Sequence, residues 1–194
     1  MSKNLIDKPR IEAAVRELLA AIGEDLDRDG LRETPQRVAR MYEELFYGQN
    51  GGAADHLDTV FDVDHRELVL LRGVSFHSMC EHHLMPFVGV AHIAYIPQER
   101  ITGLSKLVRT FKNLAARPQV QERLTSQMAD IMMEKLNPLG AAVIVEGRHL
   151  CLEMRGVRAP GSIITTSALR GAFENRASTR MELFTLIKGE RQVV

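Results

Sequence analysis

The hydrophobic period of the chain changes near residue 55, and this change limits the folds available to it. Before that point, apolar residues recur at helical spacing over residues 9–22 and again after Thr34-Pro35, which look like an N-cap and a first helical position. Residues 50–54 form a polar, glycine-bearing linker. The following segments, residues 68–74 and 88–96, have the composition of strands. The first fifty residues are therefore expected to be helical and the rest to contain a sheet.

The second half of the chain alternates between the two kinds of element. Helical patterns cover residues 104–115 and 118–136, and residues 141–146 and 149–155 predict a hairpin across Gly147-Arg148. A last helix is expected from Thr179, with Glu182 completing a capping box. Strands, paired helices and strands in this order predict an α+β fold with a mostly antiparallel sheet. We expect residues 1–54 to form an N-terminal helical arm and linker, and residues 55–194 to form the catalytic domain.

Charge and cysteine content narrow the classes of function. Lys plus Arg and Asp plus Glu both number 25, and this balance argues against a nucleic-acid partner. No apolar run has the length of a membrane span or the pattern of a signal peptide, so we expect a cytoplasmic protein with no membrane partner. A chain of zero net charge also associates readily, which favours an oligomer. The only two cysteines are Cys80 and Cys151, and in a reducing compartment they point to metal or catalysis rather than to a disulfide.

Cys80 and His83 have the spacing of two metal ligands on one turn. Cys151 supplies a possible third ligand, and on the expected strand it alternates with apolar residues so that His149, Cys151 and Arg155 share one face. Three ligands of this kind leave a tetrahedral zinc ion one open position for an activated water molecule. Zinc is favoured over iron or manganese because two thiolates suit a redox-silent ion that tolerates soft ligands. A structural zinc, with His82 or His149 as fourth ligand, is the alternative.

A second group of residues predicts anion binding. Lys106 and Arg109 lie on adjacent turns at the start of a predicted helix, and Ser105 shares a face with Arg109. Cations there oppose the helix dipole, and a bound phosphate at the helix N-terminus would compensate for that. Arg155 adds positive charge, so a nucleotide triphosphate is the expected ligand. Taken alone, a lysine and an arginine at such positions are more commonly a solvated surface pair.

Several motifs together resemble GTP cyclohydrolase I, and they occur in that family's order over most of the chain. They are Glu33 to Ala39 (ETPQRVA), Ser78 to Leu84 (SMCEHHL), Ala94 to Pro97 (AYIP), Gly103 to Leu107 (GLSKL), Arg117 to Leu124 (RPQVQERL), His149 to Cys151 (HLC) and Met154 to Arg158 (MRGVR). The resemblance implies a T-fold: an antiparallel sheet carrying two helices on one side, preceded by a helical region. It also implies a homodecamer with active sites between subunits, and the conversion of GTP and water into formate and 7,8-dihydroneopterin triphosphate, the first step of folate and pterin biosynthesis.

The resemblance also implies a role for each matching residue. Cys80, His83 and Cys151 would hold Zn²⁺, which activates the water that attacks the imidazole ring of guanine. His82 and His149 would move protons, as histidine can near neutral pH. Glu122, beside Gln121, would accept hydrogen bonds from the donor edge of guanine. The triphosphate-binding residues would be Ser105, Lys106, Arg109 and Arg155. Glu81 and Glu153 receive no role.

The chain departs from the family pattern at two places. Val90 stands where relatives often carry a basic residue, and Ile163-Ile164 is more apolar than the usual polar run. A zinc nucleoside deaminase is excluded because its C-x-x-C motif is missing. A nitrile reductase would need one of the cysteines as nucleophile, and a non-enzymatic binding protein would leave His82 and His149 without a task.

Overall fold

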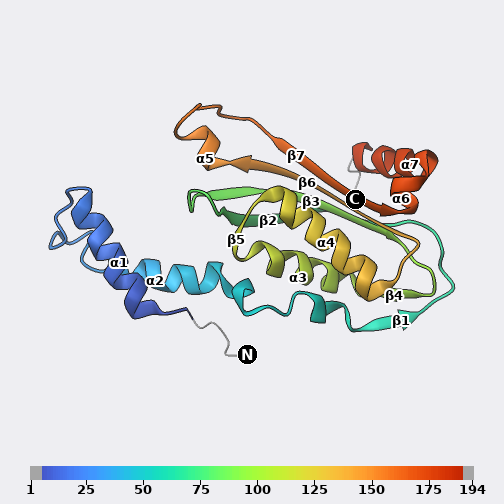
Figure 1. Cartoon of the computed structure of the whole chain (residues 1–194), viewed down its shortest axis with the longest axis horizontal. Helices are drawn as coiled ribbons and strands as arrows, with labels where there is room; N and C mark the ends of the chain where they lie inside the picture. Colours follow the sequence, from blue (N-terminus) through green and yellow to red (C-terminus); the bar gives the residue numbers. More distant parts are fainter. Residues whose placement is uncertain (1–5, 190–194) are drawn as a thin grey trace, which may run out of the picture. The chain divides into compact units, whose positions relative to one another are not determined.

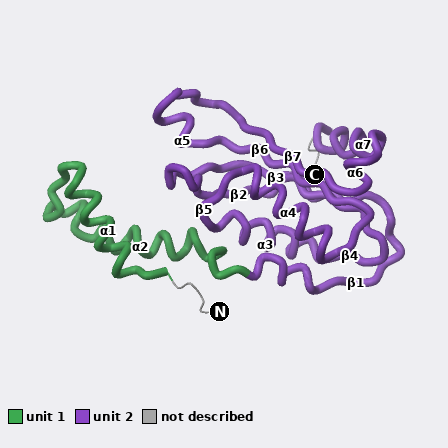
Figure 2. The backbone as a smooth tube through the Cα atoms, in the orientation of Figure 1, with its two compact units in different colours: residues 1–51 green, residues 52–194 purple. Residues whose placement is uncertain are grey.

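The computed structural model describes residues 6–189 and divides into two units, residues 1–51 and 52–194 (Figure 2). The first unit is helical, with α1 spanning Lys8–Ala21, α2 spanning Thr34–Leu45 and a short 3-10 turn, η1, at Tyr47–Asn50. The Asp7 side chain caps α1 by accepting from the Arg10 amide at 3.1 Å, while Lys8 pairs with Glu43 of α2 at 3.0 Å. These contacts join the two helices.

The expected cap of α2 is wrong by one residue. Thr34 lies inside the helix, and its hydroxyl donates to the Gly30 carbonyl at 3.3 Å instead of accepting from the first turn. Glu33 takes the cap position without a side-chain hydrogen bond. Pro35 remains in the first turn, where its missing N–H costs no helical hydrogen bond.

The second unit is built on a five-stranded sheet in the order β5-β2-β3-β6-β7 (Figure 1). Its strands are β2 (Val69–Cys80), β3 (Pro86–Ile96), β5 (Pro118–Gln119), β6 (Gly140–His149) and β7 (Ile164–Gly171). All neighbouring pairs are antiparallel except β2 with the short β5. A separate two-stranded sheet joins β1 (Val60–Asp62) to β4 (Arg100–Thr102), after the 3-10 turn η2 (Ala54–Leu57). The second unit has the expected α+β composition.

Helices α3 (Leu104–Ala115) and α4 (Gln121–Leu136) cover one face of this sheet (Figure 1). Their apolar residues form the main core with alternate residues of the strands: Leu107, Phe111, Leu124, Met128 and Met132 from the helices, and Phe87, Ala91, Ile93, Val143 and Val145 from the sheet. The opposite face is partly covered by α6 (Ala172–Asn175) and α7 (Ala177–Lys188), through Phe173 and Leu183 on Ala94, Ala142 and Ile144. The predicted capping box at Thr179 is wrong, because α7 begins at Ala177 and has no side-chain cap.

The predicted hairpin over residues 141–155 is also wrong. Strand β6 continues through Gly147 and Arg148, which are paired with β3, and Gly147 also pairs with Ile164 of β7. A strand with partners on both sides does not turn. The ladder ends at His149, opposite Phe87, because β3 begins at Pro86 and offers no partner beyond it. Residues Leu150–Glu153 then form a single helical turn, α5, so the expected alternation of His149, Cys151 and Arg155 on one strand face does not occur.

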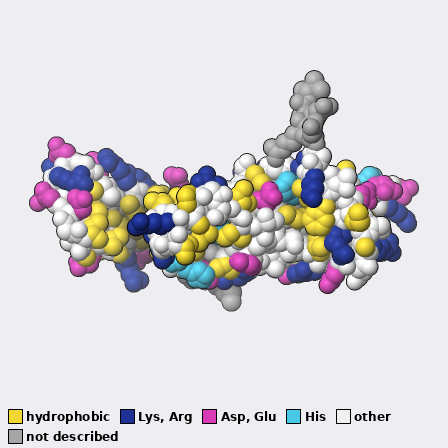
Figure 3. All heavy atoms as spheres, turned by 90° about the horizontal axis from the view of Figure 1, so that it is seen from above, with side chains coloured by type: hydrophobic (Ala, Val, Ile, Leu, Met, Phe, Trp, Pro, Cys, Tyr) yellow, Lys and Arg dark blue, Asp and Glu magenta, His cyan; other side chains and the backbone are white. Residues whose placement is uncertain are grey.

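Among the described residues, no helix has both the length and the apolarity needed to cross a bilayer. On the face drawn in Figure 3, Lys and Arg side chains are interspersed with Asp and Glu side chains. That face of the molecule therefore carries charges of both signs.

Candidate metal centre and active site

A pocket of about 220 Å³ lies where β2, β6 and the N-terminus of α4 meet. Four of the residues predicted to be catalytic or substrate-binding line it together with all three metal-ligand candidates, so sequence positions about seventy residues apart converge here. The lining residues are Cys80, His82, His83, Gln119, Val120, Gln121, Glu122, His149, Cys151, Leu152 and Ile164.

A tight turn between β2 and β3 presents Cys80 and His83. Cys80 is the last residue of β2, and its amide donates to the Met85 carbonyl at 2.9 Å while its carbonyl accepts from Leu84 at 2.8 Å. Leu84 adopts a left-handed conformation, with φ of 50°, which closes the turn. The result is that Sγ of Cys80 lies 3.9 Å from Nδ1 of His83.

Cys151 completes the group from α5. Its ligand atom and those of Cys80 and His83 all lie within 4.8 Å of one another, and the two cysteines are not joined. A tetrahedral zinc ion, with Zn–S near 2.3 Å and Zn–N near 2.0 Å, separates such donors by roughly 3.5–3.8 Å. Small side-chain adjustments would therefore suffice for the three donors to hold one ion.

The thiol chemistry also favours a cation. Burial raises the pKa of the Cys151 thiol above its ordinary value, and the adjacent Cys80 sulfur raises it further. Two thiolates this close together repel each other, and a metal cation removes that repulsion while deprotonating both. Among residues 6–189, neither His82 nor His149 belongs to the metal-ligand group, and three donors would leave a tetrahedral ion one open position.

His149 is held in one orientation by two neighbours. Its ring stacks on Phe87 with centroids 4.5 Å apart, and its Nε2 lies 2.9 Å from Oε1 of Gln121. The Gln121 amide nitrogen donates to the carbonyls of Val145 and Ile164 at 3.1 and 2.9 Å, so the atom facing the histidine is the amide oxygen, an acceptor. Nε2 must therefore carry the proton, which leaves the Nδ1 lone pair free in the neutral ring. Burial lowers the pKa of His149, and the Glu122 charge partly offsets this.

Gly147 makes room for this arrangement. A Cβ atom at residue 147 would lie 2.5 Å from Oε1 of Gln121. We expect Gly147→Ala to displace the Gln121 side chain and to lower the free energy of unfolding by about 1–3 kcal/mol, the usual cost of overpacking. Chemical denaturation measures the change. Gly189→Ala is the control, because a Cβ there meets only ordinary contacts at 3.6 Å and beyond. Equal stability of the two variants would contradict the prediction.

The residues predicted to bind substrate do not all reach this pocket. Glu122 and Gln121 both line it, but Glu122 is exposed, whereas Gln121 is 1% exposed and its amide is hydrogen-bonded to His149 and to backbone carbonyls. Ser105, Lys106 and Arg109 lie in the first two turns of α3. The other end of α3 is the one near the metal ligands, because Ser78 of β2 donates to the Ala115 carbonyl at 2.7 Å. At 1.5 Å per residue, Ser105 is about 15 Å from that end of the helix.

Arg155 lies beside His83 of the metal group, although not on the strand face that the sequence predicted. It follows α5, and its Nη1 lies 2.7 Å from Nε2 of His83. The helical turn, and not a common strand face, brings Arg155 and Cys151 to the same side.

Sequence reasoning missed the polar support of the metal-ligand turn. Glu81 forms an ion pair with Arg123 of α4, whose Nε donates to Oε1 of Gln119 at 2.7 Å, and the Glu81 amide donates to the Gln119 carbonyl at 3.0 Å. Gln119 and Arg123 are four residues apart across the start of α4, which is the one signal that could have suggested their contact. These bonds fix the turn that carries Cys80 and His83.

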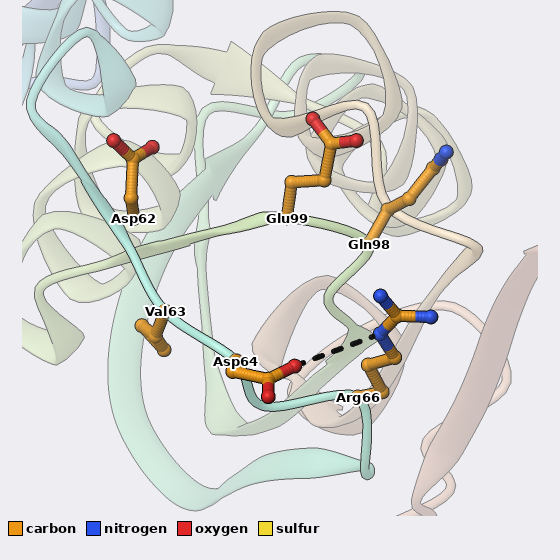
Figure 4. Close-up of a pocket in the computed structure, with 6 residues that line it drawn as sticks. All are labelled: Asp62, Val63, Asp64, Arg66, Gln98 and Glu99. Carbon is orange, nitrogen blue, oxygen red and sulfur yellow. Dashed lines mark ion pairs between the residues drawn. The ribbon is translucent and has the colours of Figure 1, made fainter.

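Two other hollows lie elsewhere in the second unit. One, of about 360 Å³, is lined by Asp62, Asp64, Arg66 and Glu99 beside the small sheet, with Asp64 and Arg66 3.9 Å apart (Figure 4). The other, of about 450 Å³, is lined by Val90 and Ile163. Both positions at which the chain departs from the family pattern therefore contribute a residue to the same hollow. Neither of them belongs to the metal group.

The fold and site define an α+β protein in which three side chains that could hold a metal ion lie beside a fixed histidine. The family model for GTP cyclohydrolase I matches residues 11–188. GTP cyclohydrolase 1 of Thermobifida fusca is 58% identical over 96% of this chain and 91% of its own length, and that of Bacillus pumilus is 55% identical over 95% and 98%. The chain belongs to the GTP cyclohydrolase I family and is an enzyme of that class. An archaeosine synthase QueF-Like structure is similar at 19% identity, with a TM-score of 0.40, over 54% of this chain and 93% of that one.

Proposed function

We propose that the protein converts GTP and water into formate and 7,8-dihydroneopterin triphosphate, the first step of folate and pterin biosynthesis. The observation that carries this proposal is the convergence of Cys80, His83 and Cys151 on one pocket with His149 and Glu122, in a chain of this family. Two reduced cysteines also suit a cytoplasmic enzyme.

We propose Zn²⁺ as the ion held by Cys80, His83 and Cys151. Two sulfurs and one imidazole nitrogen are the donors of a redox-silent ion that tolerates soft ligands. When bound, such an ion supplies Lewis acidity that makes water nucleophilic near neutral pH. Elemental analysis of freshly purified protein tests the choice of metal.

The remaining pocket residues would position guanine and move protons. The lowered pKa of His149 keeps its ring neutral near pH 7, and its free Nδ1 can take a proton and later return it. His82, which is exposed beside the pocket, is the second proton carrier. The Glu122 carboxylate accepts hydrogen bonds from the donor edge of guanine, which adenine lacks.

The residues proposed to bind the triphosphate support a site that is shared between subunits. Ser105, Lys106 and Arg109 begin α3 about 15 Å from the end near the metal group, measured at 1.5 Å per helical residue. We propose that these residues serve the metal group of a neighbouring chain, with Arg155 at the junction, in a homodecamer. In this proposal residues 55–194 are a T-fold catalytic domain, supported by the antiparallel strands and the two helices on one face, and residues 1–54 are its helical arm.

A product assay tests the reaction. The purified protein is incubated with GTP, and formate is measured together with the fluorescent pterin that appears after oxidation. We expect both products in equal amounts from GTP and neither from ATP. Release of ammonia would indicate deamination, and absence of turnover by a metal-loaded protein would contradict the proposal.

His149→Ala should separate chemistry from metal binding. Because the ring lies outside the metal group, the variant should keep its zinc while turnover of GTP falls about a hundredfold, a typical loss for a general acid–base residue. Metal content and turnover are measured on the same sample. His77→Ala is the control, since His77 is exposed on β2 away from the pocket lining. Full activity of the His149 variant would remove the proposed proton transfer.

A further inference from the structure

Glu153 is a carboxylate to which the proposed reaction gives no task, yet its surroundings are specific. It is the last residue of α5, two positions after Cys151. Its side chain is only 10% exposed, although its partner Arg148 is 57% exposed. A carboxylate that is nearly covered at the edge of a loop has usually been fixed there by its hydrogen bonds.

Three donors hold this carboxylate, and they come from two other segments. Arg148, at the end of β6, donates from Nε to Oε1 at 2.9 Å and from Nη2 to Oε2 at 2.7 Å. The backbone N–H of Gly161 donates as well. A bidentate guanidinium–carboxylate pair sets direction as well as distance. Glu153 thus ties α5 to the strand before it and to the loop after it.

The segment around Cys151 is also held by the packing of Cys151 against the main core and by the contact of Arg155 with His83. Helix α5 is a single turn without a side-chain cap, and so short a helix has little stability of its own. Two backbone bonds help, from Met154 to the Leu150 carbonyl at 2.9 Å and from Ala159 to the Leu152 carbonyl at 3.1 Å. The loop that follows contains three residues of positive φ, namely Gly156, Arg158 and Gly161. The position of the Cys151 sulfur therefore depends in part on the hydrogen bonds that Glu153 makes.

We propose that Glu153 is a positioning residue for the metal centre: held by Arg148 and Gly161, it fixes the turn that presents Cys151 to the ion. It contacts neither metal nor substrate in this role. The inference rests on the proposed metal centre of Cys80, His83 and Cys151. Outer groups that orient a metal ligand typically change metal affinity about ten- to a hundredfold when removed.

The test measures metal binding directly, with zinc affinity from competition with a chromogenic chelator and the thiolate-to-cobalt absorption of the Co²⁺-substituted protein. We expect Glu153→Ala to weaken zinc binding about ten- to a hundredfold and to change the cobalt spectrum. Arg148→Ala, at an exposed position compatible with folding, should have a smaller effect in the same direction. The double variant should be no worse than Glu153→Ala alone, because both substitutions remove one interaction. Glu182→Ala, on exposed α7 surface, should match the wild type.

A kinetic measurement separates positioning from a direct role. With zinc in excess, turnover by Glu153→Ala should recover, since the residue acts only through Cys151. Wild-type zinc affinity and cobalt spectrum in both Glu153→Ala and Arg148→Ala would overturn the inference. If Glu153→Ala does not fold, Arg148→Ala and Glu153→Gln decide the question by the same two measurements. Failure of the wild-type protein to bind either metal would instead remove the proposed centre itself.

Discussion

Replacing Cys151 by serine is expected to abolish metal retention and to lower turnover of GTP about ten-thousandfold. The substitution removes one of the three donors that lie within 4.8 Å of one another, and the two that remain, Cys80 and His83, come from a single turn. Two protein ligands would not hold the proposed zinc ion, and the reaction would then lose its Lewis acidity, worth several kcal/mol of transition-state stabilisation. Metal analysis and the formate assay on the same purified variant measure both effects.

Met154→Ser is the matched control for that substitution. Met154 directly follows α5 and is 64% exposed, so its replacement by serine alters the same loop without touching a donor. We expect wild-type metal content and turnover. A Cys151→Ser protein that keeps its zinc and its activity would show that Cys151 is not a ligand, whatever its position in the pocket.

Coexpression of two inactive variants is expected to restore activity if the site is shared between chains. Cys80→Ser alone should be inactive for the reason given above, and Lys106→Ala should lose about ten- to a hundredfold through a missing charged hydrogen bond to triphosphate. In a randomly mixed oligomer, about a quarter of the sites combine an intact metal group from one chain with an intact Lys106 from another. Differently tagged chains, purified by both tags in succession, should therefore have about a quarter of wild-type turnover.

The two cysteines supply the control for this experiment. Cys80 and Cys151 belong to one metal group within a single chain. When Cys80→Ser and Cys151→Ser chains are coexpressed, every chain lacks one donor of its own metal group, so the oligomers should remain inactive. The doubly purified oligomers of Cys80→Ser with Lys106→Ala could instead be no more active than the more active of the two single variants. Both halves of the site would then lie in one chain. That result would contradict the shared site while leaving the reaction itself open.

The metal group could be predicted from the sequence because its members have rare chemistry. Cysteine occurs only twice in the chain, and the spacing of Cys80 and His83 suits a turn whatever surrounds it. Helices α3 and α4 could be predicted equally well, because a helix of twelve or more residues repeats its apolar positions several times. Both signals are local, so they do not depend on which segments become neighbours.

The path of the chain from Gly147 to Arg155 could not be predicted in the same way. Gly147-Arg148 has the composition of a turn, but pairing with β3 on one side and β7 on the other keeps it extended. The glycine is needed for the approach of Gln121 from α4, a contact between distant segments. The alternation of polar and apolar residues after His149 likewise indicated a strand. Because β3 begins at Pro86, these residues have no residue of β3 to pair with, and they form a helical turn.

The sequence by itself determined the donor atoms, the helices that pack on the sheet and the family, because each depends on residue type and spacing along the chain. Tertiary structure alone decided that Gln121 orients His149, that Glu153 secures the turn of Cys151 and that the start of α3 lies far from the metal group. Hydrogen bonds between segments far apart in sequence have no periodic signal, and they become visible only when sheet pairing has brought the segments together.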